Sequence, residues 1–297
     1  MPEALSSTTL ALVEQWVKET DGKPFSLNSL RELHGITSAS DRAKLGTALH
    51  RLVVQKGRVE SLGRGIYRLI PQEEPEIELT KVNPYDFFPC KIPLGNVSID
   101  DYVVLYHKSL CVVAGVSNQG KTAFLLNLIK ANMAQQDIWY FFSEGGGEQL
   151  VDRLLLFDMP IEDWHFHAIP RTFNFVEVIR PDAFNIIDFY TEPDDYRNID
   201  ITWLKIIEKL DKGICWVAIQ KKQSTKMNPV ALGVGGQFTE HRTQLYLVME
   251  NNTLRIQKAK KWKKLTINPN GMRWKYKLVD GAKFVNVQQS YSQGGLE

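Results

Sequence analysis

Residues 115–122 read Gly-Val-Ser-Asn-Gln-Gly-Lys-Thr, which is the full spacing of the motif G-x-x-x-x-G-K-[S/T]. The apolar run 110–114 precedes the motif and the apolar segment 123–129 follows it, so the pattern predicts a strand, a glycine loop and a helix. In such a loop the backbone N–H groups close around phosphate oxygens, and the positive end of the helix points at them. The motif predicts a site for a nucleoside triphosphate; the alternative is a glycine turn with a structural role only.

Two side chains of this loop have specific chemistry. The Lys121 ammonium would reach the β- and γ-phosphates, and the Thr122 hydroxyl would bind Mg²⁺. A second Mg²⁺ contact is expected from Asp188, because the apolar segment 184–189 is typical of a strand with a carboxylate at the phosphate edge of a sheet. The alternative is that Asp188 caps the next turn. We expect ATP and Mg²⁺ as ligands, with the nucleotide bound by Gly115, Ser117, Asn118, Gln119, Gly120, Lys121 and Thr122.

Hydrolysis also needs a group that positions the attacking water. Glu144 follows the apolar run 138–143 and precedes three glycines, 145–147. We expect this run to be a strand beside that of the phosphate loop, with the carboxylate at its tip and the glycines leaving the approach open. The alternative is a carboxylate that stabilises the N-terminus of the following helix.

The first 70 residues are expected to form a separate domain. An apolar stripe from Leu10 to Val17 predicts a helix, residues 26–33 and 40–54 predict two more, and residues 58–62 and 66–70 alternate as strands. Three helices and a β-hairpin resemble a winged-helix domain, whose third helix enters a DNA groove. The alternative is a winged helix that contacts only proteins. The candidate DNA contacts are Arg42, Lys44, His50, Arg51, Lys56, Arg58 and Arg64.

Residues 71–90 begin with a polar, acidic, proline-containing stretch that is typical of a linker. From there to residue 297 we expect an α/β domain with a mainly parallel sheet flanked by helices, because near-continuous apolar runs alternate with helical segments. The expected parallel strands are 110–114, 138–143, 164–169, 184–189 and 214–219. Antiparallel strands are expected at 244–250, 253–259 and 274–279, with tight turns such as Asn251-Asn252.

Composition excludes few functions but narrows the setting. The sequence has neither an apolar stretch of membrane-spanning length nor the layout of a signal peptide, and Cys111 and Cys215 lie in apolar runs, so we expect a cytoplasmic protein with reduced thiols and no membrane partner. Between residues 255 and 283, lysines and arginines interleave with Trp262, Trp274 and Tyr276. This tract suits a nucleic-acid backbone, and the alternative is a solvated, lysine-rich hairpin.

Several segments together are similar to replicative helicases of the DnaB type. Residues 142–155 resemble the family's Phe-Ser-Leu-Glu-Met and Gln-Leu-x-x-Arg segment, and residues 117–122 are close to its phosphate loop. Residues 187–190 match its Ile-Asp-Tyr strand end, 215–220 its glutamine-terminated strand, and 255–260 its strand with a Lys-x-Arg pair. The resemblance covers about residues 91–283 and implies a RecA-like ATPase core.

The resemblance implies roles for four residues. Glu144 would activate water, Gln220 would sense the γ-phosphate, and Lys258 and Lys260 would reach the nucleotide of a neighbouring subunit, as would suit a ring or filament. From the phosphate-loop motif itself, Lys121 is also expected to act in catalysis at the phosphates. Three departures stand out: glycines follow Glu144, Lys260 replaces an arginine that could bind phosphate bidentately, and a winged helix replaces the helical N-terminal domain. The alternative for Lys258 and Lys260 is a surface lysine pair.

The segment 221–242 directly follows the Gln220 strand. In RecA-like motors the loop at this place lines the central channel and holds single-stranded DNA with backbone amides and basic side chains. The expected contacts are Lys221, Lys222, Lys226, Gly235 and Gly236. The alternative is a surface loop without a ligand.

The function expected from these features is an ATP-hydrolysing, oligomeric DNA-binding motor, similar to helicases or translocases. It would act in replication, recombination or DNA processing by a phage or mobile element. Single-stranded DNA would bind at the core and double-stranded DNA at the winged helix, and a replication or recombination protein is a candidate partner. Two alternatives stay open: a helicase loader or recombination mediator that uses ATP for assembly, and an ATP-switched DNA-binding regulator of a mobile element or defence system.

Overall fold

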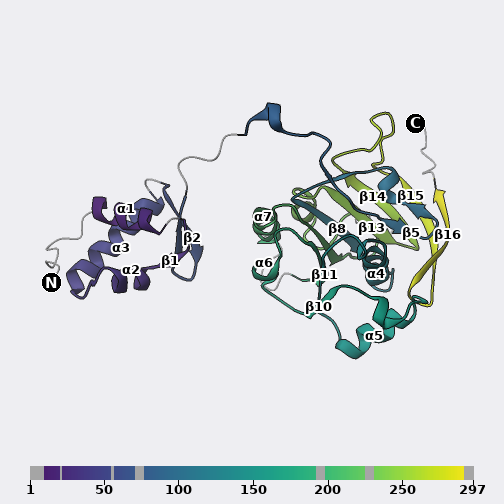
Figure 1. The fold of residues 1–297 in the computed structure, drawn as a ribbon, viewed down its shortest axis with the longest axis horizontal. Coiled ribbons are helices and arrows are strands. Elements are labelled where there is room, and N and C mark those ends of the chain that lie inside the picture. The colour runs from purple at the N-terminus through teal and green to yellow at the C-terminus, as the bar shows by residue number, and fades with distance from the viewer. Residues whose placement is uncertain are drawn as a thin grey trace. The chain divides into compact units, whose positions relative to one another are not determined.

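A computed structural model describes residues 10–20, 22–54, 57–70, 77–191, 198–224 and 231–290. The chain forms two compact units, Met1–Val82 and Asn83–Glu297, shown in Figure 1. The boundary falls inside the segment 71–90, which the sequence analysis treats as a linker. Lys56 and Lys226, two of the expected nucleic-acid contacts, lie outside the described residues.

The smaller unit packs three helices against a three-stranded antiparallel sheet. Its helices are α1 (Leu10–Glu19), α2 (Leu27–Leu33) and α3 (Ala39–Val54), and its strands are β1 (Phe25–Ser26), β2 (Val59–Gly63) and β3 (Ile66–Leu69). The expected helices and hairpin are present; β1, which pairs with β3, was not expected. Helix α2 begins after Ser26 because the Ser26 hydroxyl accepts a hydrogen bond from the Ser29 N–H at 3.0 Å. Apolar residues from all three helices and from β1 and β2 form its core, among them Val13, Phe25, Leu30, Leu45, Leu49 and Val59.

The larger unit is α/β, as expected, and is built on a nine-stranded sheet in the order β10-β9-β11-β12-β8-β13-β14-β15-β16. The first six strands in this order are parallel, and each later neighbour is antiparallel. The strands are β8 (Ser109–Gly115), β9 (Ile138–Phe142), β10 (His167–Pro170), β11 (Phe184–Tyr190), β12 (Ile214–Gln220), β13 (Leu245–Glu250), β14 (Thr253–Ala259), β15 (Arg273–Val279) and β16 (Lys283–Ser290).

Both faces of the parallel part are covered. Side chains of α4 (Lys121–Asn132) and α5 (Gly147–Leu155) join the core on one face, and side chains of α6 (Phe175–Val178) and α7 (Ile199–Lys209) join the core on the other. The central strands are therefore apolar at consecutive positions, as the sequence analysis expected of a doubly covered parallel sheet. Shorter elements complete the unit: β4 (Phe87–Phe88), β5 (Pro93–Leu94), β6 (Val97–Ser98), β7 (Leu105–Tyr106), α8 (Gln237–Glu240), and the 3₁₀ turns Ile99–Asp101 and Ile161–Asp163. A further 3₁₀ turn, Leu79–Lys81, precedes the boundary between the units.

Two expectations about the strands were wrong, and a third was incomplete. Strand β13 pairs antiparallel with β14, as expected, but it also pairs in parallel with β8, so it joins the two parts of the sheet. Strand β9 does not lie beside β8, because β12 and β11 lie between them. The expected strand 164–169 begins at His167 and is a largely exposed edge. The pairings of β9 and β13 depend on contacts between segments that are distant in sequence.

The β13–β14 turn follows the sequence expectation. Asn251 and Asn252 have φ values of 51° and 53°. Asparagine tolerates this left-handed region, and a two-residue turn with positive φ matches the twist of a hairpin. The turn lets β14 return directly beside β13.

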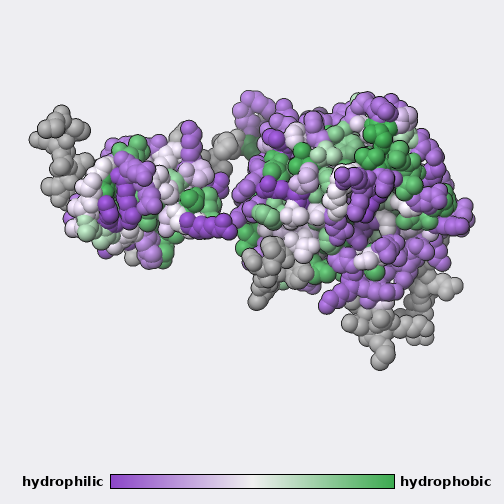
Figure 2. Space-filling model, turned by 90° about the horizontal axis from the view of Figure 1, so that it is seen from below, coloured by the Kyte–Doolittle hydropathy of each residue, from purple (hydrophilic) through white to green (hydrophobic). Residues whose placement is uncertain are grey.

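Figure 2 shows one face of the molecule, on which hydrophilic residues cover most of both units and hydrophobic residues occupy smaller areas between them. Cys111 and Cys215 are buried free thiols, as expected. Among the residues that the structure describes, no helix combines the length and the apolar character needed to cross a membrane.

The aromatic residues of β15 are part of the core. Trp274 and Tyr276 are 1% and 5% exposed, and the Trp274 ring packs with its centroid 5.3 Å from that of Tyr102. Their alternation with basic residues therefore reflects the two faces of a strand. Both rings are inaccessible to bases, so the expected use of aromatics beside nucleic acid was wrong for Trp274 and Tyr276, whereas Trp262 is half-buried.

We predict that Trp274→Ala lowers the free energy of unfolding of the larger unit by about 3–5 kcal/mol, because it leaves a cavity under the antiparallel strands. Urea unfolding followed by circular dichroism measures the change. Leu265→Ala is the control, since Leu265 is 78% exposed and its replacement is expected to cost less than about 0.5 kcal/mol. Equal midpoints for wild type and Trp274→Ala would contradict the packing described here.

Candidate nucleotide-binding site

The phosphate loop connects the buried strand β8 to helix α4. Gly120 precedes the first helical residue with φ 87°, and Asn118 has φ 60°. A Cβ atom on Gly120 would lie 3.1 Å from Cδ2 of Leu278, so both the backbone conformation and the available space favour glycine. The loop thus has the strand–loop–helix context that the motif requires.

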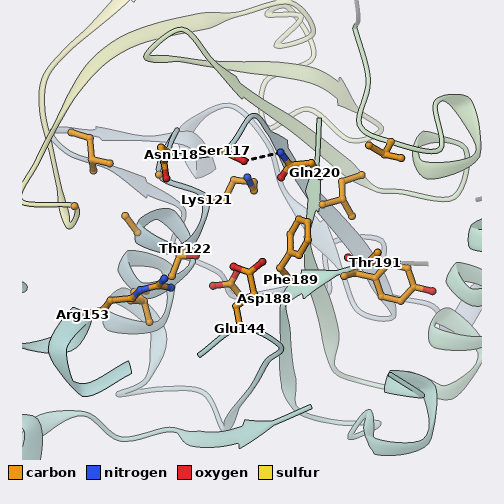
Figure 3. Close-up of a pocket in the computed structure, with 18 of the residues that line it drawn as sticks. Ser117, Asn118, Lys121, Thr122, Glu144, Arg153, Asp188, Phe189, Thr191 and Gln220 are labelled. Atoms are coloured by element: carbon orange, nitrogen blue, oxygen red, sulfur yellow. Dashed lines mark hydrogen bonds between the residues drawn. The ribbon is translucent and has the colours of Figure 1, made fainter. Parts of the chain in front are cut away.

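Three later segments of the chain hold the loop in place. The Gln220 side-chain amide donates a hydrogen bond to Ser117 Oγ at 2.9 Å, the dashed line in Figure 3. The Asn252 N–H donates to the Gln119 side-chain oxygen at 2.8 Å, and the Tyr276 hydroxyl donates to the Gln119 carbonyl at 2.7 Å. The antiparallel strands therefore support the loop from the side opposite to β12.

Lys121 lies at the start of α4, and its ammonium donates to the carbonyls of Gly115 at 2.9 Å and Val116 at 3.1 Å. Burial lowers the pKa of Lys121, and the nearby carboxylates of Asp188 and Glu144 counteract part of that shift. The ammonium is thus a cation between the loop and two carboxylates, as expected of a phosphate-binding lysine.

Asp188 lies near the end of β11 and is 6% exposed. The Tyr140 hydroxyl donates to its Oδ2 at 2.7 Å, and the Thr122 hydroxyl is a second hydrogen-bond partner. Burial raises the pKa of Asp188, against the opposing effects of these two hydroxyls and of the Arg153 and Lys121 charges. The Asp188–Phe189 peptide bond is cis.

Glu144 follows β9 and reaches the same pocket although β9 is not beside β8. Figure 3 shows its carboxylate next to that of Asp188. Ser143 sets this position: its N–H donates to the Asp188 carbonyl at 2.9 Å, and its hydroxyl donates to the Phe189 carbonyl at 2.8 Å. The bonds of Ser143 to β11 therefore position the Glu144 carboxylate, although β11 is two strands away from β8 and its phosphate loop.

These residues line one cavity of about 840 Å³, a volume suited to a nucleotide-sized ligand. Sequence reasoning missed two residues of this region. Arg153, on α5, lines the cavity and carries a charge that lowers the pKa of Asp188. Its place in the Gln-Leu-x-x-Arg segment was an available signal, whereas Tyr140, which donates to Asp188, had none beyond the two-residue period of its strand.

The donor set suits Mg²⁺. Thr122 and Asp188 offer a hydroxyl and a carboxylate in direct contact, and Mg²⁺ prefers oxygen ligands, of which proteins commonly supply one or two. The remaining positions would go to water and to phosphate oxygens. The buried carboxylate, whose pKa burial raises, would be stabilised by a divalent cation beside it.

Lys258 and Lys260 are not part of this cavity. Ala259, which lies between them, pairs with Leu245 of β13, and Leu245 pairs with Cys111 of β8. The two lysines therefore lie near the start of β8, whereas the phosphate loop follows the end of β8. The Lys258 ammonium donates to the carbonyls of Glu240 at 2.6 Å and His241 at 3.0 Å, and Lys260 is exposed. Neither lysine therefore reaches the nucleotide site of its own chain.

Lys221 was wrongly expected to contact nucleic acid. It is 1% exposed, and its ammonium forms an ion pair with Glu250 at 2.9 Å and donates to Ser224 Oγ at 3.0 Å. Burial raises the pKa of Glu250, but hydrogen bonds from Ser224 and Lys221 and the Lys221 charge outweigh burial and hold that pKa below its usual range. Lys221 is structural because this pair fastens the segment after β12 to the end of β13.

The rest of this segment is only partly accessible. Lys222 is exposed, Gly235 and Gly236 have φ values of 98° and 55°, and Gly233 packs so tightly that a Cβ would lie 2.5 Å from Ile219. These glycines allow a tight turn against β12 and β13. The Val234 N–H donates to the Gln220 carbonyl at 2.7 Å, so the turn is linked directly to the pocket.

In the smaller unit, four expected contacts are exposed: Arg42, Lys44 and Arg51 on α3, and Arg64 in the β2–β3 turn. His50 is exposed on the same helix. Arg58 instead contacts Glu14 at 3.5 Å within the unit. Helix α3 and the turn therefore present separate groups of cations.

Comparison with known proteins finds no matching family model and no similar curated protein. The functional interpretation rests on the geometry of this pocket. Three strand ends, a phosphate loop and two carboxylates meet there.

We predict that Asp188→Asn is stabilising at neutral pH. Because burial raises the pKa of Asp188, the folded protein binds this proton more tightly than the unfolded chain, which has a pKa of about 3.9. The stabilisation is complete below that value and is lost as the pH rises through the folded pKa. Asparagine does not titrate, so the variant should gain stability over wild type as the pH rises.

Urea unfolding in a metal chelator at several pH values measures this difference. The exposed carboxylate of Asp211 supplies the control, Asp211→Asn. Stability profiles of wild type and Asp188→Asn that stay parallel across the range would contradict the raised pKa.

Proposed function

We propose that this protein is an ATP-hydrolysing, DNA-binding motor with a RecA-like core similar to helicases of the DnaB type. The observation that carries the proposal is the meeting of Lys121, Thr122, Asp188 and Glu144 in one cavity (Figure 3). A phosphate loop alone fits many functions. A second carboxylate beside the Mg²⁺ ligand supports hydrolysis in addition to binding.

The chemistry follows from the placement of these groups. Lys121 would neutralise charge on the β- and γ-phosphates, and Thr122 and Asp188 would hold Mg²⁺. Glu144 would accept a proton from the attacking water while the bond between the γ-phosphorus and the β–γ bridging oxygen breaks, giving ADP and phosphate. Arg153 adds a positive charge on the side of α5.

Gln220 would couple this reaction to DNA. Its side chain donates to Ser117 of the phosphate loop, while its carbonyl accepts from Val234. A change at the γ-phosphate would move Gln220 and, through these bonds, the turn that contains Gly235 and Gly236. Lys222 would contact single-stranded DNA beside that turn.

Assembly into a ring or filament is part of the proposal. Lys258 and Lys260 lie away from the nucleotide site of their own chain, which is the arrangement required of residues that serve a neighbouring subunit. Lys260 is exposed at the end of β14 and is the better candidate, because the Lys258 ammonium is already bonded to carbonyls of its own chain.

The smaller unit is proposed to be a winged helix that binds double-stranded DNA. Its element order α1-β1-α2-α3-β2-β3 supports this interpretation, with α3 as the groove-binding helix and the β2–β3 turn as the wing. Exposed Arg42, Lys44 and Arg51 on α3 and Arg64 in the turn would contact the duplex.

We predict that Glu144→Gln retains ATP binding but reduces turnover by about 10²–10⁴-fold, because the amide cannot accept the proton of water. Binding of a fluorescent ATP analogue and phosphate release are measured separately. Glu148→Gln, an exposed glutamate in the first turn of α5, is the control and should behave as wild type. Unchanged turnover in Glu144→Gln would remove Glu144 from the mechanism.

We further predict that Lys260→Ala lowers ATP hydrolysis per subunit only under conditions in which subunits assemble. Activity and mass are followed together across a dilution series with an ATP analogue and single-stranded DNA. Lys264→Ala, an exposed lysine of the same β14–β15 connection, is the matched control. The trans role fails if wild type keeps full activity per subunit after dilution to monomers.

A further inference from the structure

One face of β14 and β15 carries a row of cations outside the nucleotide pocket. On β15, Trp274 and Tyr276 point into the core, so Arg273, Lys275 and Lys277 lie on the opposite face. On β14, Leu254 and Ile256 are buried, which puts Arg255 on the same outer face. We call these four residues, Arg255, Arg273, Lys275 and Lys277, the basic strand face.

Helices α6 and α7 cover the corresponding face of the parallel strands but do not cover the basic strand face. The core that α6 and α7 cover extends across the sheet to Tyr246 and Val248 of β13, and contains no residue of β14 or β15 among those the structure describes. Lys275 and Lys277 are exposed, and Arg255 and Arg273 are half-buried. The four cations are therefore left on a strand face that the helices of that layer do not reach.

The nearby anions do not balance these charges. Glu250 already forms an ion pair with the buried Lys221, and Glu240 accepts a hydrogen bond from Gln257 at 3.4 Å. Among the described residues, the face contains no ion pair that involves Arg255, Arg273, Lys275 or Lys277. The face has a net positive charge.

Two of the cations lie directly opposite each other on the neighbouring strands β14 and β15. Arg255 and Arg273 are direct register partners, a placement that costs free energy for like charges. Burial lowers the pKa of Arg255, and the Arg273 charge lowers it further, with Glu250 and Glu240 opposing both effects. Nε of Arg273 is buried and has no hydrogen-bond partner among the described residues. An anion bound between the two guanidinium groups would offset the repulsion between the two charges and would give Nε of Arg273 a hydrogen-bond acceptor.

We infer that the basic strand face binds the phosphodiester backbone of single-stranded nucleic acid. Alternate residues of a strand are about 6.6 Å apart, so Arg273, Lys275 and Lys277 form a regular row of cations on one face of β15. Such a row suits a polyanion with regularly repeated charges, as the phosphodiester backbone is. None of the large apolar residues exposed in the described chain lies on β14 or β15, so the face lacks the apolar anchors of a membrane-binding surface.

The face is continuous with the segment proposed to contact DNA. Arg255 donates to the Ala231 carbonyl at 3.2 Å, and Lys221 and Ser224 bind Glu250 beside Thr253, the register partner of Lys275. One described end of that segment, at Ala231, is therefore bonded to Arg255. The other end, at Ser224, is held beside the β14 residue that pairs with Lys275. The inference rests on the proposed function for the identity of the ligand, and adds a second backbone contact to the proposed motor.

The experiment uses the full chain and two variants, Lys275→Gln/Lys277→Gln and Arg273→Gln. Binding of a labelled single-stranded oligonucleotide is followed by fluorescence anisotropy at several salt concentrations. Removing one cation that neutralises a phosphate should lower the slope of log K against log salt by about 0.7. The double variant should therefore have a slope smaller by about 1.4, and Arg273→Gln a slope smaller by about 0.7. Lys205→Gln/Lys212→Gln, two exposed lysines away from β14 and β15, should retain the wild-type slope.

Two further measurements separate this inference from the proposed function. ATP hydrolysis without nucleic acid should be equal in wild type and all variants, and its absence in wild type would count against the proposed function alone. Unfolding midpoints confirm that the variants fold. Wild-type slope and affinity in both test variants would overturn the inference, as would wild-type binding to phosphatidylserine vesicles or polyglutamate in preference to the oligonucleotide.

Discussion

The parallel pairing of β8, β12, β11 and β9 is the constraint on which the site depends. Parallel strands place their carboxyl ends at one edge of a sheet, so segments far apart in the sequence deliver the phosphate loop, Gln220, Asp188 and Glu144 to one cavity. Because β12 lies between β8 and β11, Gln220 ends the strand that separates the strand of the loop from the strand of Asp188. Its side chain bonds directly to the loop, and its backbone bonds to the next turn.

The antiparallel strands have a second role at the same edge. The β13–β14 turn and Tyr276 of β15 bond to Gln119 from the side opposite to β12. The buried aromatic face of β15 fixes Tyr276, while the outer face of the same strand carries lysines and arginine. One strand therefore supports the phosphate loop with its inner face and presents cations with its outer face, which places both close together without sharing residues.

The sequence could predict what is local. The phosphate loop, the helix after it, the Asn251-Asn252 turn and a carboxylate at the end of β11 follow from short motifs and periodicity. It could not predict that β13 pairs in parallel with β8 or that β9 pairs with β11, because strand order depends on packing between distant segments. The same reason explains Lys221, which looked like a surface cation of a glycine-rich loop. Its ion-pair partner Glu250 lies on β13, which β8 separates from β12.

Two places in the larger unit have charged side chains whose burial or like-charge neighbours cost free energy: Asp188 in the pocket, and Arg255 and Arg273 on the outer face of β14 and β15. At the pocket, burial raises the pKa of Asp188 although Tyr140, Thr122, Arg153 and Lys121 all oppose the shift, so an added cation would restore the charge of this carboxylate. On the outer face of β14 and β15, Arg255 and Arg273 repel each other where an added anion would remove the cost. A folded chain of marginal stability retains such costs where ligands offset them. These charges support the two ligands that we propose: Mg²⁺ with a nucleotide in the pocket, and a polyanion on the strand face.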